Sequence, residues 1–375
     1  MRLRKAIYLL PLAVPLLLSS LAEAKSGWSR AGNLVAGVDS GNAFALSDGR
    51  VVSVGIPSVI PWWPATTQIW NPATNKWTKP ASMPLLPNLF RAVPILLDDG
   101  RILVTGFCTS SCGSGSNTEI YDPATDTWAA PGQMATGRFG HMAVKLLDGR
   151  VLVMGGCSAS ACGSDTASAE IFDPKTNTFA PAASMKAHRA SFGATLLADG
   201  HILVTGGYNS TGVMTGNETY DPAADKWTVN PSMNHPHALH VALLLQDGRV
   251  LVAGGDTGLG LPGAEADLFD PVTGKWKAAG SMAQRREYFQ GATLPNGKAI
   301  VVGGYSINGE MFVSLATCER FNPATNKFVP AKSMKNERTE FSITTLPDGR
   351  IMAVGGDAYL NGEFKVPGNA ELFTP

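Results

Sequence analysis

Four arginines occupy the same position of a repeated pattern, ten residues before an Asp-Gly or Asn-Gly dipeptide. They are Arg138, Arg189, Arg286 and Arg338, and His237 holds this position in another repeat. Such a set of cations could bind the carboxylates of an acidic ligand through bidentate hydrogen bonds, so these five residues are candidate ligand contacts. The alternative, which the pattern favours, is internal pairing, because buried carboxylates need cationic or hydrogen-bonding partners. The residues that recur later in each repeat as such partners are Gln68, Glu119, Glu170, Glu218, Asp267, Glu319 and Glu371.

Histidines gather in the segment HPHALH, which contains His235, His237 and His240. Three imidazoles could hold zinc or copper. The alternation of side chains along a strand would put His237 and His240 on opposite faces, however. Phenylalanine takes the position of His240 in other repeats, and His141 takes it in a further one. We therefore predict packing roles for these histidines and no metal site.

Aromatic residues mark the variable segments within the repeats. The segment PWWP contains Trp62 and Trp63, and Tyr208, Tyr305 and Tyr359 lie in corresponding segments. Exposed tryptophans between prolines would form a rigid surface for stacking sugar rings or for a protein partner. Packing of these tryptophans against a neighbouring loop is the alternative.

Paired cysteines close two of the variable segments. Cys108 and Cys112 enclose three residues, and Cys157 and Cys162 enclose four, at equivalent points of successive repeats. In an oxidising compartment this spacing predicts two local disulfides. The fifth cysteine, Cys318, lies on a predicted strand and is expected to be a small buried residue.

The candidate residues recur at equivalent positions because the whole chain is built from repeats. The Asp-Gly or Asn-Gly turn recurs seven times at intervals of 48 to 52 residues, and a Trp or Phe recurs with it. In the unit 138–185, apolar runs flank the two-residue turn at Asp148, which is a strong hairpin signal. Two more strands follow, around AEIFDP and around Phe179. Each unit is thus predicted to be a four-stranded antiparallel sheet, which makes the protein all-β.

The Gly-Gly pairs that follow the second strand, with the downstream acidic-aromatic-Asp-Pro segment and the final aromatic, resemble the kelch repeat. The resemblance covers 28–375 and implies a β-propeller. The first two units depart from it, since Gly55 and Gly106 are followed by Ile and Phe. The Gly-Gly pairs begin at Gly155, Gly206, Gly254, Gly303 and Gly355.

Ring closure follows from the two ends of the sequence. The last unit stops at ELFTP after its third strand, whereas GWSRAGNL near the start matches a fourth strand. We therefore predict one seven-bladed propeller over 25–375, whose last blade is closed by the N-terminal strand. Antiparallel order places all Asp-Gly turns at one end of the disc. The variable loops lie at the other end, where specificity is expected.

The first 24 residues have the pattern of a secretory signal peptide. Arg2, Arg4 and Lys5 precede a short apolar run, and Ala22-Glu23-Ala24 suits cleavage. Without them the chain has 27 basic and 29 acidic residues, which offers no electrostatic basis for nucleic-acid binding. We expect a secreted or periplasmic monomer, bacterial in origin, with no membrane anchor after cleavage.

These patterns favour a binding module for a protein or a glycan at the variable-loop face, without a cofactor. The alternative is a carbohydrate-active enzyme, because the kelch propeller is also the core of galactose oxidase-type copper enzymes and of sialic acid mutarotases. The former resemblance implies a Tyr-Cys cross-link, a second Tyr and a His from an additional domain. The sequence has no Tyr-His dipeptide, and its paired cysteines are expected to bond to each other. G-x-S-x-G, H-E-x-x-H and a P-loop are also missing. The sequence thus leaves catalysis open and leans against it.

Overall fold

The computed structural model describes residues 26–57, 66–79, 92–107, 115–158, 165–258, 260–308, 311–360 and 363–375. The predicted signal peptide, Trp62, Trp63 and three of the paired cysteines lie outside these ranges. The described residues form only strands, turns and bends. They include no helix that is long and apolar enough to cross a membrane.

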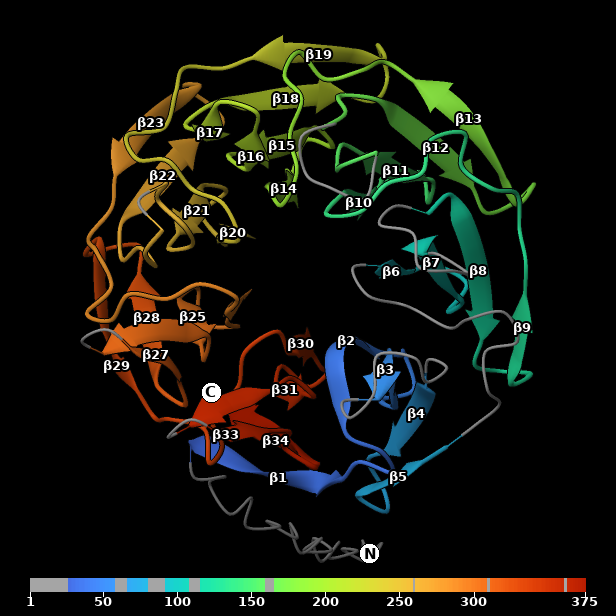
Figure 1. Ribbon diagram of the computed structural model, residues 1–375, viewed down its shortest axis with the longest axis vertical. Helices are drawn as coiled ribbons and strands as arrows, with labels where there is room; N and C mark the ends of the chain where they lie inside the picture. Colours follow the sequence, from blue (N-terminus) through green and yellow to red (C-terminus); the bar gives the residue numbers. More distant parts are fainter. Residues whose placement is uncertain are drawn as a thin grey trace, which may run out of the picture.

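Seven four-stranded antiparallel sheets surround a central opening (Figure 1). The first three blades comprise β2 (Val38–Ala45), β3 (Val51–Pro57), β4 (Thr66–Asn71) and β5 (Lys76–Thr78); β6 (Val93–Leu96), β7 (Ile102–Phe107), β8 (Asn117–Asp122) and β9 (Thr127–Ala129); and β10 (Met142–Lys145), β11 (Val151–Met154), β12 (Ala169–Asp173) and β13 (Thr178–Ala182). The next three comprise β14 (Gly193–Leu196), β15 (Ile202–Thr205), β18 (Asn217–Asp221) and β19 (Lys226–Val229); β20 (Val241–Leu244), β21 (Val250–Ala253), β22 (Ala266–Asp270) and β23 (Lys275–Ala278); and β24 (Gln290–Thr293), β25 (Ala299–Val302), β28 (Cys318–Asn322) and β29 (Lys327–Ala331).

The two ends of the chain share the seventh blade. Its strands are β30 (Ser342–Thr345), β31 (Ile351–Val354), β34 (Asn369–Thr374) and β1 (Gly27–Asn33). Strand β1 pairs antiparallel with β34, and Trp28 lies opposite Phe373. This confirms the predicted all-β class, the seven blades and the closure by the N-terminal strand.

The core lies between neighbouring blades. One cluster joins Leu152 and Met154 of β11 to Ile202 and Val204 of β15, all fully buried. In six of the seven blades the recurring aromatic of the fourth strand contacts an aromatic on the third, as Phe179 does with Phe172 at a ring-centroid distance of 4.9 Å. These contacts explain why the aromatic recurs with the turn, since each blade needs it to bury its outer half. Cys318 is buried in such a cluster, as predicted.

The Asp-Gly turns are one residue longer than the predicted two-residue turns. In the third blade Gly149 N–H donates to the carbonyl of Leu146, and Leu146 N–H donates to that of Arg150. Gly149 has a φ of 86°, which a glycine adopts without steric cost. This is a three-residue loop with glycine in the left-handed position. At the same end, Arg150 pairs with Asp148 at 2.7 Å.

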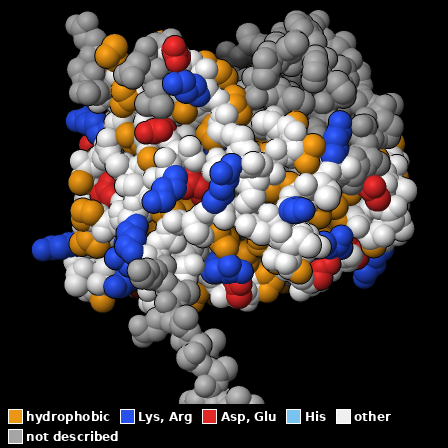
Figure 2. Space-filling model, turned by 90° about the horizontal axis from the view of Figure 1, so that it is seen from below, with side chains coloured by type: hydrophobic (Ala, Val, Ile, Leu, Met, Phe, Trp, Pro, Cys, Tyr) orange, Lys and Arg blue, Asp and Glu red, His pale blue; other side chains and the backbone are white. Residues whose placement is uncertain are grey.

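The variable loops of three blades contain short hairpins that the sequence patterns did not predict. They consist of β16 (Tyr208–Asn209) with β17 (Gly212–Val213), β26 (Tyr305–Asn308) with β27 (Met311–Ser314), and β32 (Ala358–Leu360) with β33 (Glu363–Lys365). They carry Tyr208, Tyr305 and Tyr359, so these side chains project from paired strands and not from irregular loops. A side view shows Lys, Arg, Asp and Glu scattered over the face it presents (Figure 2).

Candidate functional site

The predicted arginines form a buried clamp in each of four blades. In the third blade, Arg138 Nη1 donates to the carbonyl of Gly155 at 2.9 Å and Nη2 to Glu170 Oε1 at 2.8 Å. The guanidinium therefore ties the first glycine of the Gly-Gly pair to the carboxylate on the third strand. The other three clamps are Arg189 with Glu218, Arg286 with Glu319, and Arg338 with Glu371.

The same carboxylate also holds the connection from the preceding blade. Glu170 accepts hydrogen bonds from the backbone N–H groups of Ala135 and Thr136 at 2.7 and 3.1 Å. The four arginines are 0 to 1% exposed. The structure thus contains the internal pairing that the sequence favoured. Ligand contact at Arg138, Arg189, Arg286 and Arg338 stays a prediction, and their burial weighs against it.

The fifth blade has a different clamp. His237 Nδ1 lies 2.8 Å from the carbonyl of Gly254, and its Nε2 lies 3.5 Å from Asp267 Oδ2. Both side chains are fully buried. A histidine and an aspartate therefore replace the arginine and glutamate of the other blades, and ligand contact at His237 likewise stays a prediction.

Two further histidines lie beside the inner strands. His141 Nε2 and His240 Nε2 each lie 2.9 Å from a threonine hydroxyl of the neighbouring sheet, that of Thr105 and Thr205 respectively. Burial lowers the pKa of His141 to about 3. The predicted packing role of these two residues agrees with this geometry. The expectation that His237 and His240 point to opposite faces was wrong, because both precede β20 and their ring centroids are 5.6 Å apart.

A set of backbone positions with left-handed φ lies at the variable-loop end of blades three to seven, two residues after each clamp cation. We call it the mouth ring. Its residues all have φ between 49 and 60°, a region that bulky side chains rarely enter. Backbone bonds link neighbouring blades here, since Ser191 N–H donates to the carbonyl of Gly140 and Leu239 N–H to that of Ser191. The mouth ring consists of Gly140, Ser191, Leu239, Tyr288 and Glu340.

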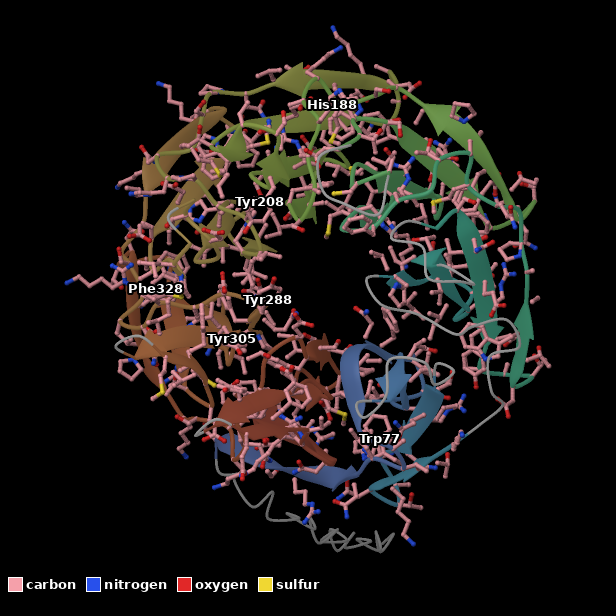
Figure 3. All side chains as sticks on the ribbon, viewed as in Figure 1. Trp77, His188, Tyr208, Tyr288, Tyr305 and Phe328 are labelled. Atoms are coloured by element: carbon pink, nitrogen blue, oxygen red, sulfur yellow. The ribbon has the colours of Figure 1, made fainter. Side chains whose placement is uncertain are left out.

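Tyrosines and carboxylates adjoin the mouth ring, and we call them the mouth cluster. Its members are the half-buried residues Tyr208, Asp256, Glu287, Tyr305 and Asp357. The Tyr208 hydroxyl donates to Asp256 Oδ2 at 2.6 Å. In Figure 3, Tyr208, Tyr288 and Tyr305 lie on the inner side of the ring, around one part of the opening. The structure thus brings two sequence-predicted tyrosines together with acidic residues that the sequence patterns did not single out.

The electrostatics of the mouth cluster are those of carboxylates crowded together. Burial, together with the charge of Asp256, raises the pKa of Glu287 to about 7. Burial raises the pKa of Asp357, and Glu340 raises it further, while a hydrogen bond from Thr339 opposes the shift. The pKa of Tyr305 is raised by burial and by Asp357. The described part of this end of the opening, in blades four to seven, is therefore rich in carboxylates.

Exposed aromatic residues border the mouth in blades six and seven. Tyr288 is 37% exposed and Tyr359 is 38% exposed. Phe312 is also exposed, and its ring packs edge-on against Tyr305 with centroids 5.4 Å apart. Exposed aromatic rings beside carboxylates can stack on the apolar face of a sugar while the carboxylates accept hydrogen bonds from its hydroxyl groups.

The predicted disulfides remain predictions. Cys157 is buried, and its Sγ lies 3.3 Å from Asp165 Oδ1. Cys108, Cys112 and Cys162 lie outside the described residues, as do Trp62 and Trp63.

Two shallow hollows lie away from the mouth. One is lined by Arg150, Asp173 and Tyr220 at the Asp-Gly end, and the other by Trp28 and Lys332 beside β1. Neither contains a predicted site residue.

The described residues do not match the copper centre that the galactose oxidase resemblance implies. The hydroxyl of Tyr208 donates a hydrogen bond to the carboxylate of Asp256, and the thiol of Cys157 lies beside Asp165. His141 and His240 contact threonine hydroxyls below the mouth. These contacts are not those of a tyrosyl-copper centre.

Comparison with known proteins identifies the repeat. A family model described as the kelch motif matches residues 138–186 and 189–234, the third blade and the strands of the fourth. The other five blades have the same four-stranded order. The protein is a seven-bladed β-propeller that contains kelch motifs. No curated protein sequence matches this chain.

Solved structures with this kelch propeller fold include a fungal alcohol oxidase of the AA5 family in complex with copper. It is 18% identical, with a TM-score of 0.72 over 93% of this chain and 75% of that one. The structure of YjhT is also 18% identical, with a TM-score of 0.59 over 80% of this chain and 99% of that one. At this identity the likeness concerns the fold alone.

Proposed function

We propose that this kelch propeller is a glycan-binding module whose binding surface is the mouth, formed by Tyr288 and the mouth cluster. The observation that carries the proposal is the conformation of Tyr288. Its backbone has a φ of 50°, and its side chain stays 37% exposed at the rim of the opening. A bulky residue in this region costs free energy, and such strain is concentrated where a side chain must be presented for function.

The side chains around Tyr288 favour one class of glycan. The carboxylates of Asp256, Glu287 and Glu340 lie around the tyrosines. Burial, and secondarily these neighbouring charges, raises the pKa values of Tyr208, Tyr305 and Glu287. Carboxylates accept hydrogen bonds from sugar hydroxyls and repel anionic sugars. A neutral glycan therefore suits this surface better than an acidic peptide or a sialic acid, and the sialic acid mutarotase alternative loses support.

The test is a glycan array with neutral, amino and acidic sugars, followed by calorimetry on the best ligand. We expect neutral glycans to bind and Tyr288→Ala to weaken binding at least tenfold, since burying a large apolar side chain contributes about 1.5–3 kcal/mol. Leu147→Ala is the control, because Leu147 is an exposed apolar residue at the Asp-Gly end.

Three outcomes would contradict the proposal. Binding that is equal in Tyr288→Ala and Leu147→Ala would place the glycan elsewhere. Selective capture of basic peptides would indicate a protein partner at the acidic mouth. Turnover of a sugar by the purified protein would favour the enzyme alternative.

A further inference from the structure

The clamp of the fifth blade differs from the others in three positions at once. Besides His237 for arginine and Asp267 for glutamate, His235 occupies the connection before the blade. Equivalent positions in other blades hold Thr136, Ala187 and other residues that give a backbone N–H to the carboxylate. His235 keeps that backbone bond to Asp267, at 3.0 Å, and adds an imidazole beside the carboxylate.

Three ligand atoms converge on one point as a result. His235 Nδ1 lies 3.3 Å from Asp267 Oδ2, and His237 Nε2 lies 3.5 Å from the same oxygen. All three atoms lie within 4.8 Å of one another. Around a tetrahedral zinc ion with bonds of about 2.0–2.1 Å, neighbouring ligand atoms are separated by about 3.3–3.4 Å. Two of the three separations therefore already suit a single ion.

The hydrogen bond of His237 to Gly254 uses Nδ1 and leaves Nε2, the atom that faces this point, without a hydrogen-bond partner. A carbonyl only accepts, so the bond to Gly254 puts the proton on Nδ1. Nε2 then has a lone pair directed at a carboxylate oxygen, and it has no hydrogen-bond partner although it is buried. Two facing acceptors need a cation between them, either a second proton or a metal ion.

The outer contacts are those that support metal ligands. A metal-binding histidine usually donates its other N–H to a carbonyl or carboxylate, as His237 does to Gly254. The second oxygen of Asp267 accepts a bond from Asn234 Nδ2 at 2.7 Å, which orients the carboxylate. The side chain of His235 is 36% exposed, whereas those of His237 and Asp267 are fully buried. An ion could thus enter past His235 and keep a water on its open side.

We infer that His235, His237 and Asp267 form a binding site for one divalent transition-metal ion with a preference for imidazole, such as Zn²⁺. Two imidazoles and a carboxylate, with a solvent position, are ligands that Zn²⁺, Co²⁺, Ni²⁺ and Cu²⁺ all accept. The site tethers the connection from the fourth blade to the third strand of the fifth, the task of the arginine clamp elsewhere. This inference is independent of the proposed glycan binding.

The test measures metal binding to the untagged full chain after treatment with a chelator. We expect one equivalent of Zn²⁺ by calorimetry, and Co²⁺ should give the visible absorption of a tetrahedral nitrogen and oxygen site. His235→Ala should lower the affinity at least tenfold. His188→Ala, at an exposed histidine of another loop, should change neither the stoichiometry nor the affinity.

A second variant separates metal binding from folding. The double change His237→Arg with Asp267→Glu recreates the clamp of the third, fourth, sixth and seventh blades. It should fold and keep its melting temperature in chelator, yet lose the bound equivalent and the rise in melting temperature that Zn²⁺ gives the natural protein. Zn²⁺ binding that is unchanged in this variant, or no Zn²⁺ binding by the natural protein, would overturn the inference and leave a proton as the cation between His237 and Asp267.

Discussion

Arg286 and Tyr288 are two residues apart and lie in opposite environments. Arg286 is fully buried and bonded to Gly303 and Glu319, whereas Tyr288 is exposed at the opening. The clamp layer has the same residue types, Arg and Glu, in four blades, while the mouth ring has a different side chain at each of its five positions. The first layer is determined by the cost of burying charge and the second is free to vary. Function should therefore be sought in the mouth ring and in the one clamp that departs from the pattern.

The largest effect should come from removing a clamp cation. Arg189→Ala leaves Glu218, which is 1% exposed, without its cation, and we expect the free energy of unfolding to fall by about 3–5 kcal/mol. Arg150→Ala removes an exposed ion pair at the Asp-Gly end and should cost about 1 kcal/mol or less. Urea unfolding of both variants measures the difference. Equal losses would show that the clamp layer is not the stabilising one.

A smaller effect concerns His141, which is buried beside Thr105. Its pKa is lowered to about 3 in the folded state from an ordinary value near 6.5, so the unfolded chain binds the extra proton between these values. The stability that neutral His141 contributes is complete above pH 6.5 and is lost as the pH falls, by about 2 kcal/mol at pH 5. In His141→Phe with Thr105→Val, thermal unfolding should lose this part of the acid sensitivity. A drop between pH 7 and pH 5 as steep as in the natural protein would contradict this account.

The mouth carboxylate should respond to pH in the opposite direction. The pKa of Glu287 is raised to about 7 in the folded state, from 4.5, so the folded protein holds the proton longer. Stability is highest below pH 4.5 for this group and decreases as the pH rises through 7. Glu287→Gln should therefore be more stable than the natural protein at pH 8, by about 1 kcal/mol after allowance for solvent screening, and similar to it at pH 4. Melting curves at both values test this, and a variant that is less stable at pH 8 would refute it.

The smallest effect should be found in the backbone of the mouth ring. Leu239 has a φ of 53°, so Leu239→Gly relieves about 1–2 kcal/mol of strain and costs about 0.5–1 kcal/mol of chain entropy. Its stability should be unchanged or higher by up to about 1 kcal/mol. Ala194→Gly in β14 has no such relief and should be destabilised by about 0.5–1 kcal/mol. If both variants lose stability equally, the mouth ring is not strained.

The blade count, the strand order and the closure could be predicted because each depends on residues that recur with the turn. The arginine clamps could be predicted as one of two alternatives, since the sequence shows both partners but not their burial. The mouth ring could not, because Ser191, Leu239, Tyr288 and Glu340 have no residue type in common. Their shared conformation comes from bonds between blades that a repeat pattern does not reveal.

The histidines show a second limit of the sequence patterns. Alternation applies only within a strand, and the strand begins at Val241, after His237 and His240. His235 is in turn supplied by the connection from the preceding blade, so its approach to Asp267 depends on how two blades meet. The hairpin β26–β27, with Tyr305 and Phe312, was likewise hidden in a segment expected to be a variable loop.

The pairing of β1 with β34 joins residues as far apart as Ser29 and Leu372. Blades one to six can each form from local segments as the chain lengthens, yet the seventh needs both the oldest and the newest strand. The entropic cost of closing the longest loop therefore falls on the last step of folding, and we expect this step to limit the rate of folding. Until it is complete, the outer edge of β34 stays open to pairing with another chain, which makes the final seam the point where aggregation competes with the native ring.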